Sequence, residues 1–263
     1  MFYAHRSDRF KFIMCTNGRC GSTLTKRWYL SIHGRDLPIP GDHSSVHNAL
    51  PYEDEDLHVA RAGFDGHPYF KFIVVRNPWE RLVSFYKVWV VSNQINHESL
   101  GRDCSFEKLI DQLEKDGPKD ANTVQQFQDL DGLKFDKIVY LEDVDSGMKE
   151  VCQACNIGFD ETQFSERIFE SPLIEGDPIK DIHKATGHEI VERDHWPEWR
   201  RFYTKSLRDR VSKIYARDIE AFGYQWPSLD GDVEYPRSKP PEPAEKPAEP
   251  AKRSSKRRRS SLR

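Results

Sequence analysis

Residues Phe10–Trp28 read FKFIMCTNGRCGSTLTKRW and decide the fold of the N-terminal half. The apolar run Phe10–Met14 predicts a buried strand, and the Asn17-Gly18 pair predicts a turn. From Ser22 the pattern becomes helical. A strand, a small-residue loop and a helix start together gather backbone N–H groups and the positive end of a helix dipole around one point. The stretch therefore predicts a cradle for a phosphate or sulfate group.

The loop differs from a Walker A motif. That motif requires G-x-x-x-x-G-K-[ST], whereas here Gly18 and Gly21 are three positions apart and no lysine precedes Ser22 and Thr23. This difference disfavours an ordinary nucleoside triphosphate kinase. A strand-to-helix turn without any ligand is the alternative that the loop alone leaves open.

A second strand-to-helix unit begins with YFKFIVVR at Tyr69–Arg76 and continues as NPWERLVSFYKVW. We expect Asn77 to cap the helix, with a proline in its first turn and Glu80 three positions after the cap, as in a capping box. The apolar residues that follow share one helical stripe, which should face the core: Trp79, Leu82, Val83, Tyr86, Trp89 and Val90. Arg76 and Ser84 fall outside this stripe.

Together the two units resemble the donor-binding segments of sulfotransferases that use 3′-phosphoadenosine-5′-phosphosulfate (PAPS). GRCGSTL resembles the 5′-phosphosulfate loop, and VVRNPWERLVSFYK resembles the 3′-phosphate segment of the Golgi carbohydrate branch, sulfotransferase family 2, which includes the chondroitin and dermatan enzymes. The resemblance implies that Arg76 and Ser84 hold the 3′-phosphate, through a planar fork of N–H donors and one hydroxyl. A surface ion pair is the open alternative for Arg76 taken singly.

The same resemblance assigns the first loop to the 5′-phosphosulfate. Backbone N–H groups and hydroxyls would hold that group, and the residues implied are Arg19, Cys20, Gly21, Ser22, Thr23 and Leu24. Arg19 stands where many relatives have Lys. It would stabilise charge on the bridging oxygen as the phosphate leaves, although a guanidinium is a poor proton donor. The scheme uses PAPS as co-substrate and requires no metal.

Sulfonate transfer also needs a base that removes the acceptor proton, and histidine has a suitable pKa. Candidates lie in the long connection Arg35–Gly66, because α/β proteins place their chemistry in loops at strand ends. Here His47 is preferred over His43. Glu53 and Glu55 are the next candidates, since relatives take a His or Glu from the connection after the first helix. A solvent-exposed loop histidine is the alternative for either one.

Three later elements complete the predicted fold. SFEKLIDQLEKDG is typical of an amphipathic helix that stops at Gly117, and KFDKIVYLEDV predicts a third buried strand. Glu142 and Asp143, at the tip of that strand, are expected to cap the helix that follows rather than to act in catalysis. The run Phe202–Tyr224 predicts a C-terminal helix with Thr204 as its N-cap, and it resembles the last helix of the same branch.

Two further segments are candidates for ligand contacts. In HKATGHEI, Lys184 and Thr186 are candidates for phosphate contact, because a comparable loop of relatives closes over the nucleotide. A flexible surface loop is the alternative. In relatives, a segment before the third strand often contacts the acceptor through a His, with a Gln close behind it. The corresponding segment of this chain, NTVQQ, lacks the His and keeps only Gln125 and Gln126. This departure leaves the acceptor open.

Composition fits one enzyme-sized domain followed by a tail. Hydrophobic residues make up 37% of the 263 residues, enough for a substantial core. We expect a sulfotransferase domain over 1–227 and a disordered Pro/Ala/Glu-rich linker with a basic end over 228–263. The last twelve residues carry seven Lys or Arg and no acid, which against a net charge of −3 leaves −10 for the rest. Such a body is no general nucleic-acid binder, whereas the tail is a candidate to contact an acidic partner.

Five cysteines, an odd number, favour reduced thiols over a disulfide framework. Cys152 and Cys155 form a C-x-x-C without a second pair at zinc-finger spacing, so packing within a helix is the preferred interpretation. The sequence has no run of about eighteen apolar residues, and MFYAHRSDRF lacks a signal-peptide core. These features predict cytoplasmic placement without a membrane anchor.

The sequence therefore predicts a three-layer α/β protein with a P-loop-like first crossover and a mainly parallel central sheet flanked by helices. The expected reaction is transfer of a sulfonate group from PAPS to a hydroxyl or amine. A carbohydrate is favoured over a small metabolite or a tyrosine as the acceptor. Two alternatives remain: an atypical P-loop kinase that requires Mg²⁺ and ATP, and a non-catalytic protein that binds the nucleotide without turnover.

Overall fold

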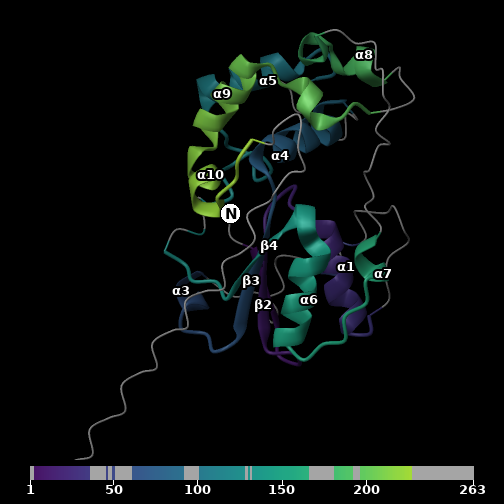
Figure 1. The fold of residues 1–263 in the computed structure, drawn as a ribbon, viewed down its shortest axis with the longest axis vertical. Helices are drawn as coiled ribbons and strands as arrows, with labels where there is room; N and C mark the ends of the chain where they lie inside the picture. The colour runs from purple at the N-terminus through teal and green to yellow at the C-terminus, as the bar shows by residue number, and fades with distance from the viewer. Residues whose placement is uncertain are drawn as a thin grey trace, which may run out of the picture.

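The fold was described from a computed structural model of the chain. It describes residues 3–35, 46, 49–50, 61–91, 101–127, 130, 132–165, 181–191 and 196–226. In this part of the chain, a central sheet is flanked by helices on both faces, as predicted (Figure 1). The predicted tail, 228–263, lies outside the described residues.

Four strands form the sheet of the described residues, in the order β1-β2-β3-β4: β1 (Tyr3–Ser7), β2 (Phe12–Thr16), β3 (Phe70–Val75) and β4 (Lys137–Tyr140). Strands β2, β3 and β4 are parallel to one another, and β1 pairs antiparallel with β2. This confirms the mainly parallel sheet. Strand β1 was not predicted, because YAHRS has no apolar run and gains its strand partners only from β2.

One face of the sheet is covered by α1 (Ser22–Ile32) and α6 (Val144–Ala154), with the short α7 (Thr162–Ser165) beside α1. The core on this face joins strand and helix side chains, among them Phe12, Met14, Phe72, Trp28 and Met148. Helix α6 packs so closely that a Cβ on Gly147 would lie 2.7 Å from Val139 Cγ1. Cys152 and Cys155 are buried free thiols in this core, which agrees with packing as their role.

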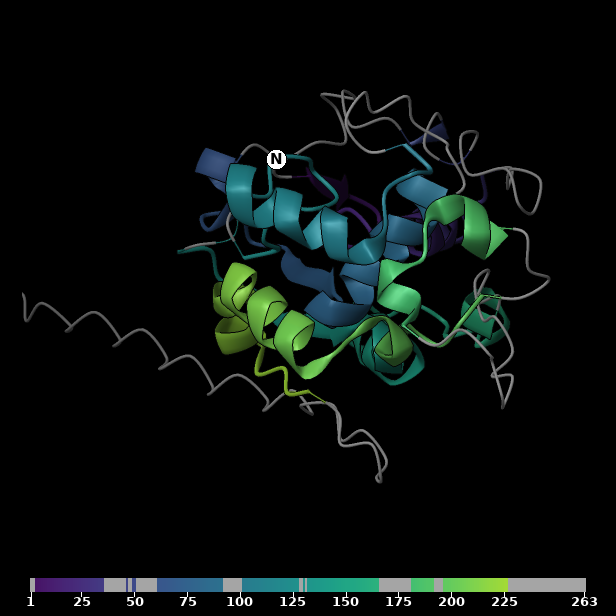
Figure 2. The same cartoon turned by 90° about the horizontal axis from the view of Figure 1, so that it is seen from above.

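The other face is covered by α4 (Pro78–Phe85), α5 (Phe106–Asp116), α9 (Lys205–Ile214) and α10 (Ala216–Phe222). Helix α4 continues as a π-helix, η1 (Tyr86–Val91). Figure 2 shows α5 and α9 side by side over this face, where Arg210 bridges to Asp111 and Glu114 at 2.5 and 2.6 Å. Short elements complete the described fold: α3 (Arg61–Phe64), α8 (Gly187–Val191), η2 (Leu141–Asp143), η3 (Ile182–Lys184) and η4 (Trp199–Phe202).

The predicted C-terminal helix is two helices rather than one. Thr204 does cap α9, because its Oγ1 accepts a hydrogen bond from Leu207 N at 3.2 Å. The helix breaks at Tyr215, whose hydroxyl donates to the carbonyl oxygen of Thr123 at 2.8 Å. The prediction of one continuous helix is wrong at this point, since this tertiary contact leaves no periodic signal in the sequence. None of the helices in the described ranges has both the length and the apolar character needed to cross a bilayer.

Candidate functional site

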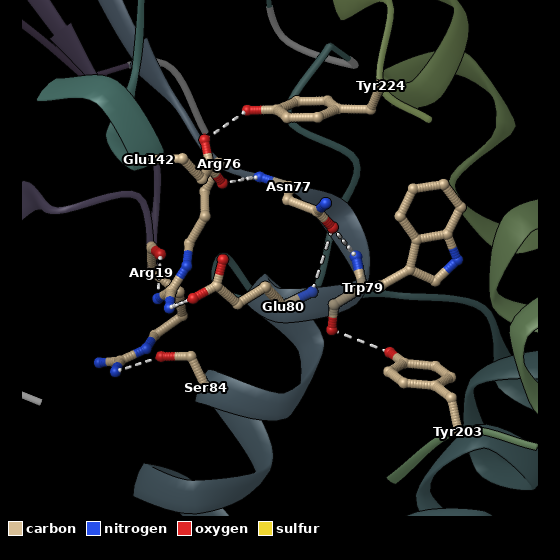
Figure 3. A network of polar contacts seen from close by, with 9 residues as sticks. All are labelled: Arg19, Arg76, Asn77, Trp79, Glu80, Ser84, Glu142, Tyr203 and Tyr224. Atoms are coloured by element: carbon tan, nitrogen blue, oxygen red, sulfur yellow. Dashed lines mark hydrogen bonds and ion pairs between the residues drawn. The ribbon is translucent and has the colours of Figure 1, made fainter. Parts of the chain in front are cut away.

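The two predicted donor-binding units meet at one edge of the sheet. Strands β2 and β3 are adjacent and parallel, so the loop after Thr16 and the segment after Val75 emerge from the same edge. In open α/β sheets, ligands bind outside the carboxyl ends of the strands. Figure 3 shows Arg19 of the first unit lying beside Arg76 and Ser84 of the second.

Direct hydrogen bonds join the two units. Arg19 Nη2 donates to Ser84 Oγ at 2.9 Å, and Arg76 Nη1 donates to the carbonyl oxygen of Arg19 at 3.4 Å. The sequence assigned Arg19 to the 5′ end of the nucleotide and Ser84 to the 3′ end. In the structure these residues form one continuous polar surface.

The loop between β2 and α1 follows a tight path with two left-handed residues, Arg19 at φ 63° and Gly21 at φ 74°. Cys20 N donates to the carbonyl oxygen of Asn17 at 3.2 Å and closes the turn. A Cβ on Gly18 would lie 2.7 Å from the carbonyl oxygen of Ala121, so this close approach of two backbones requires glycine. The loop is therefore held in one shape by its own backbone and by the neighbouring segment.

The N-terminus of α1 carries backbone donors without a protein acceptor in the helix. Its first intrahelical bond runs from Thr25 N to the carbonyl oxygen of Gly21 at 3.0 Å. The N–H groups of Ser22, Thr23 and Leu24 precede this bond and have no acceptor four residues back. Gly21 provides no capping side chain, and the first turn contains no acid. This end of an eleven-residue helix suits an anionic ligand.

Positive charge is concentrated around the loop. Burial and then the charge of Arg76 lower the pKa of Arg19 to about 10, so its guanidinium stays protonated at neutral pH. Burial and then the charges of Arg19 and Arg76 also lower the pKa of Lys87. Glu80 supplies a carboxylate here and pairs with Arg76 Nη2 at 2.9 Å. Charges of one sign held together favour the binding of an oppositely charged group.

The start of α4 differs in detail from the prediction. Asn77 caps the helix as expected, since its Oδ1 accepts from Trp79 N at 3.0 Å and Glu80 N at 3.3 Å. The prediction of a capping box is wrong, however, because the Glu80 carboxylate binds the side chain of Arg76. Glu142 takes its place: Glu142 Oε1 accepts from Asn77 N at 2.5 Å.

The sequence predicted that Glu142 caps α6, and this prediction is wrong. Asp143 occupies the N-cap position of α6 without a side-chain cap bond. Glu142 instead turns toward α4, and its Oε2 accepts from the Tyr224 hydroxyl at 3.2 Å (Figure 3). Burial, and then the nearby Glu80, raise the pKa of Glu142 to about 7. This carboxyl links the end of β4, the start of α4 and the C-terminal segment.

Gln126 is a central residue of the site whose role was not foreseen. Its Oε1 accepts from Arg76 N at 2.8 Å and from Cys20 Sγ at 2.9 Å, and its Nε2 donates to the carbonyl oxygen of Arg76 at 2.8 Å. Asp218 holds this segment by accepting from Gln126 N at 2.9 Å and Phe127 N at 2.8 Å. Gln125 Nε2 donates to the carbonyl oxygen of Ile214 at 2.7 Å. Both glutamine amides thus make framework contacts.

Arg81 is a second residue that the sequence did not reveal. It is only 2% exposed, and its guanidinium donates to the carbonyl oxygens of Gly18 and Val124, both at 2.8 Å. A buried charge requires such partners, because desolvation without hydrogen bonds is costly. One available signal was a charged residue beside the apolar stripe of α4. Arg81 therefore joins the β2–α1 loop at Gly18 to the segment that contains Val124.

The candidates for the catalytic base come from the connection after α1. His43, His47, Glu53 and Glu55 lie outside the described residues. Their connection is anchored nearby, where Lys26 Nζ donates to the carbonyl oxygen of Leu50 at 2.9 Å.

The loop at Lys184 and Thr186 is described. Thr186 Oγ1 and N both bond Glu189 Oε2, at 3.0 and 2.7 Å, and thereby begin α8. Lys184 is exposed on η3, and its contact with the nucleotide stays a prediction.

With this geometry established, comparison with known proteins identifies the class. The sulfotransferase family matches residues 4–225, and the chain belongs to this family. It is 24% identical over 252 residues to carbohydrate sulfotransferase 10 of Xenopus laevis, a match that covers 85% of this chain and 67% of that protein. It is also 30% identical over 95 residues to carbohydrate sulfotransferase 10 of Danio rerio, covering 33% of this chain and 25% of that protein. No solved structure matches the chain significantly.

Proposed function

We propose that this protein transfers the sulfonate group of PAPS to a hydroxyl group of a carbohydrate. The contact of Arg19 with Ser84 and Arg76 carries the proposal, because it joins two anion-binding surfaces at one sheet edge. A nucleotide with phosphates on both its 3′ and 5′ positions needs two such surfaces. The names of the related proteins from Xenopus laevis and Danio rerio support a carbohydrate as the acceptor.

At the 5′ end, the N–H groups of Ser22, Thr23 and Leu24 would hold the phosphosulfate at the start of α1. Arg19 would place its charge near the oxygen that bridges sulfur and phosphorus. Negative charge develops on this oxygen as the bond to sulfur breaks, and a fixed cation stabilises it. Because a guanidinium is a poor proton donor, Arg19 would act here as a fixed charge.

At the 3′ end, Arg76 and Ser84 would hold the phosphate. The Ser84 oxygen accepts from Arg19, which leaves its own O–H proton free to donate to a phosphate oxygen. In the free protein, the Glu80 carboxylate pairs with one nitrogen of the Arg76 guanidinium. A phosphate dianion would compete with this carboxylate for Arg76, because it carries the larger charge and can bind the guanidinium in a bidentate arrangement.

The acceptor hydroxyl would attack sulfur while a base removes its proton. A new sulfur–oxygen bond forms to the acceptor, the bond to the 5′-phosphate oxygen breaks, and 3′-phosphoadenosine-5′-phosphate leaves. We keep His47 as the preferred base and His43 as the second choice, with their positions outside the described residues. The Lys26 contact with Leu50 would tie their connection to α1. Tail binding to an acidic partner and cytoplasmic placement stay predictions.

Transfer can be tested directly with PAPS that carries radiolabelled sulfate. The purified protein is incubated in EDTA with a panel of glycans, a tyrosine-containing peptide and a phenol. We expect label on at least one glycan and not on the peptide or phenol. His47→Ala is expected to lower kcat by about a hundredfold or more if it is the base, with His43→Ala as the paired comparison. Label on the peptide or phenol alone would contradict the carbohydrate assignment.

A further inference from the structure

A polar face runs along α4 and into η1, directly opposite the β2–α1 loop. Glu80, Ser84 and Lys87 follow one another at spacings of four and three residues, which makes their side chains neighbours on one face of the helix. Ser84 is the member of this face that Arg19 contacts, at 2.9 Å. Lys87 therefore lies one turn beyond the residue that is expected to hold the 3′-phosphate.

The Lys87 ammonium group is held by an aromatic ring. Its Nζ lies over the ring of Trp196, 5.0 Å from the centroid, and Trp196 in turn stacks on Phe202 with ring centroids 5.3 Å apart. A cation–π contact orients an ammonium group. Lys87 also belongs to the π-helical segment Tyr86–Val91, and single π-turns are frequent at functional sites.

Three cations act on one another along this surface. Arg19 and Arg76 both act on Lys87, as the lowered pKa of its ammonium group records after the effect of burial. Glu80 supplies a carboxylate on the same helix face, and it is bound to Arg76. Cations held together repel one another, and a doubly charged anion placed between them would offset this repulsion.

We infer that Lys87 is a third ligand of the nucleotide 3′-phosphate, beside Arg76 and Ser84, and that it helps the enzyme select 3′-phosphorylated nucleotides. This inference rests on the proposed function, because it concerns the same donor site. Trp196 would act as a positioning residue that points the ammonium group toward the phosphate.

Calorimetry on the full chain with two nucleotides tests the inference. One is 3′-phosphoadenosine-5′-phosphate, and the other is adenosine 5′-monophosphate, which lacks the 3′-phosphate. Loss of one charge-assisted contact in Lys87→Met should weaken binding of the first about tenfold and leave the second within about twofold of wild type. Lys87→Arg should recover most of the loss. Lys205→Met, which removes a lysine that is 80% exposed on α9, is the matched control and should change neither affinity.

A second variant guards against damage to folding. Trp196→Phe retains an aromatic ring that packs on Phe202 but has a weaker negative face, so it should cause a smaller loss, about two- to threefold, confined to the 3′-phosphorylated nucleotide. Unchanged affinity for that nucleotide in Lys87→Met, or an equal loss for both nucleotides, would overturn the inference. Failure of the wild-type protein to bind it would instead contradict the proposed function itself.

Discussion

Helices α1 and α4 both begin at the same edge of the sheet, yet their N-termini are completed in opposite ways. At α4, Asn77 caps two N–H groups, Glu142 accepts from Asn77 N, and Glu80 puts an acid in the first turn. At α1, Gly21 offers no cap and the first turn has no acid. Within the described residues, side chains therefore complete the start of α4, whereas the start of α1 has no side-chain cap.

This difference separates two modes of anion binding. The α1 end would bind through backbone N–H groups and the helix dipole, which recognise charge with little dependence on side-chain identity. Helix α4 and the following η1 would bind through one lateral face, where Ser84 and Lys87 present side chains, with Arg76 just before the start of α4. The two modes predict different sensitivities to mutation.

The largest effect is expected at the loop that joins both surfaces. Arg19→Ala should lower kcat by about 100- to 1,000-fold, because a fixed charge on the departing oxygen is lost. Arg19→Lys restores a charge and should retain most of the activity. Steady-state kinetics with PAPS provides the readout, and a wild-type kcat in Arg19→Ala would exclude this role.

The cap of α4 should affect stability before it affects binding. Asn77→Ala removes the acceptor for two backbone N–H groups, so the free energy of unfolding should fall by about 1–2 kcal/mol. Chemical denaturation measures this change. Nucleotide affinity at a temperature where the variant is folded should change by less than about threefold. Loss of nucleotide affinity without loss of stability would contradict a structural role for the Asn77 cap.

Glu142 should make stability depend on pH. Its pKa is about 7 in the folded protein, above the ordinary value of 4.5, so the folded state holds a proton that the unfolded state has released. The stabilisation that Glu142 provides is complete below about pH 4.5 and is lost as pH rises to about 7. Glu142→Gln cannot ionise, so its stability relative to wild type should improve by roughly 3 kcal/mol across this window. Urea titrations of both proteins at several pH values measure the difference, and a constant difference would contradict the assignment.

The smallest stability effect comes from making α1 resemble α4. Ser22→Asp places an acid in the first turn, and the free protein should gain about 0.3–1 kcal/mol of stability from the helix dipole. The same carboxylate should repel the 5′-phosphosulfate and weaken nucleotide binding by about tenfold or more. The conservative Ser22→Asn variant lacks the charge and serves as the control. Equal binding by Ser22→Asp and wild type would show that this end is not the anion site.

Local patterns in the sequence were sufficient for much of the fold. Helix α1 begins at the predicted Ser22, and α5 is capped by Ser105 and stops at the predicted Gly117. These boundaries are set by turn residues, caps and apolar periodicity, all of which act within a few positions. Strand β1 and the break at Tyr215 depend on partners elsewhere in the chain, so no local pattern announced them.

The residues of the site also differ in whether local sequence patterns could predict them. The candidate residues Arg19, Arg76 and Ser84 could be predicted because they stand at fixed positions in recognisable motifs. Gln126 and Arg81 were missed as supports, since their roles arise from carbonyl and amide groups that are 40 to 65 positions away and meet only in the folded protein. The base candidates fall outside the described residues.

The most direct test of the donor site is a calorimetric titration with 3′-phosphoadenosine-5′-phosphate and, separately, ATP, in the presence of EDTA. We predict that the 3′-phosphorylated nucleotide binds tightly without metal and that Arg76→Ala and Ser84→Ala each weaken this binding. Binding of ATP alone, and only after Mg²⁺ is restored, would contradict it.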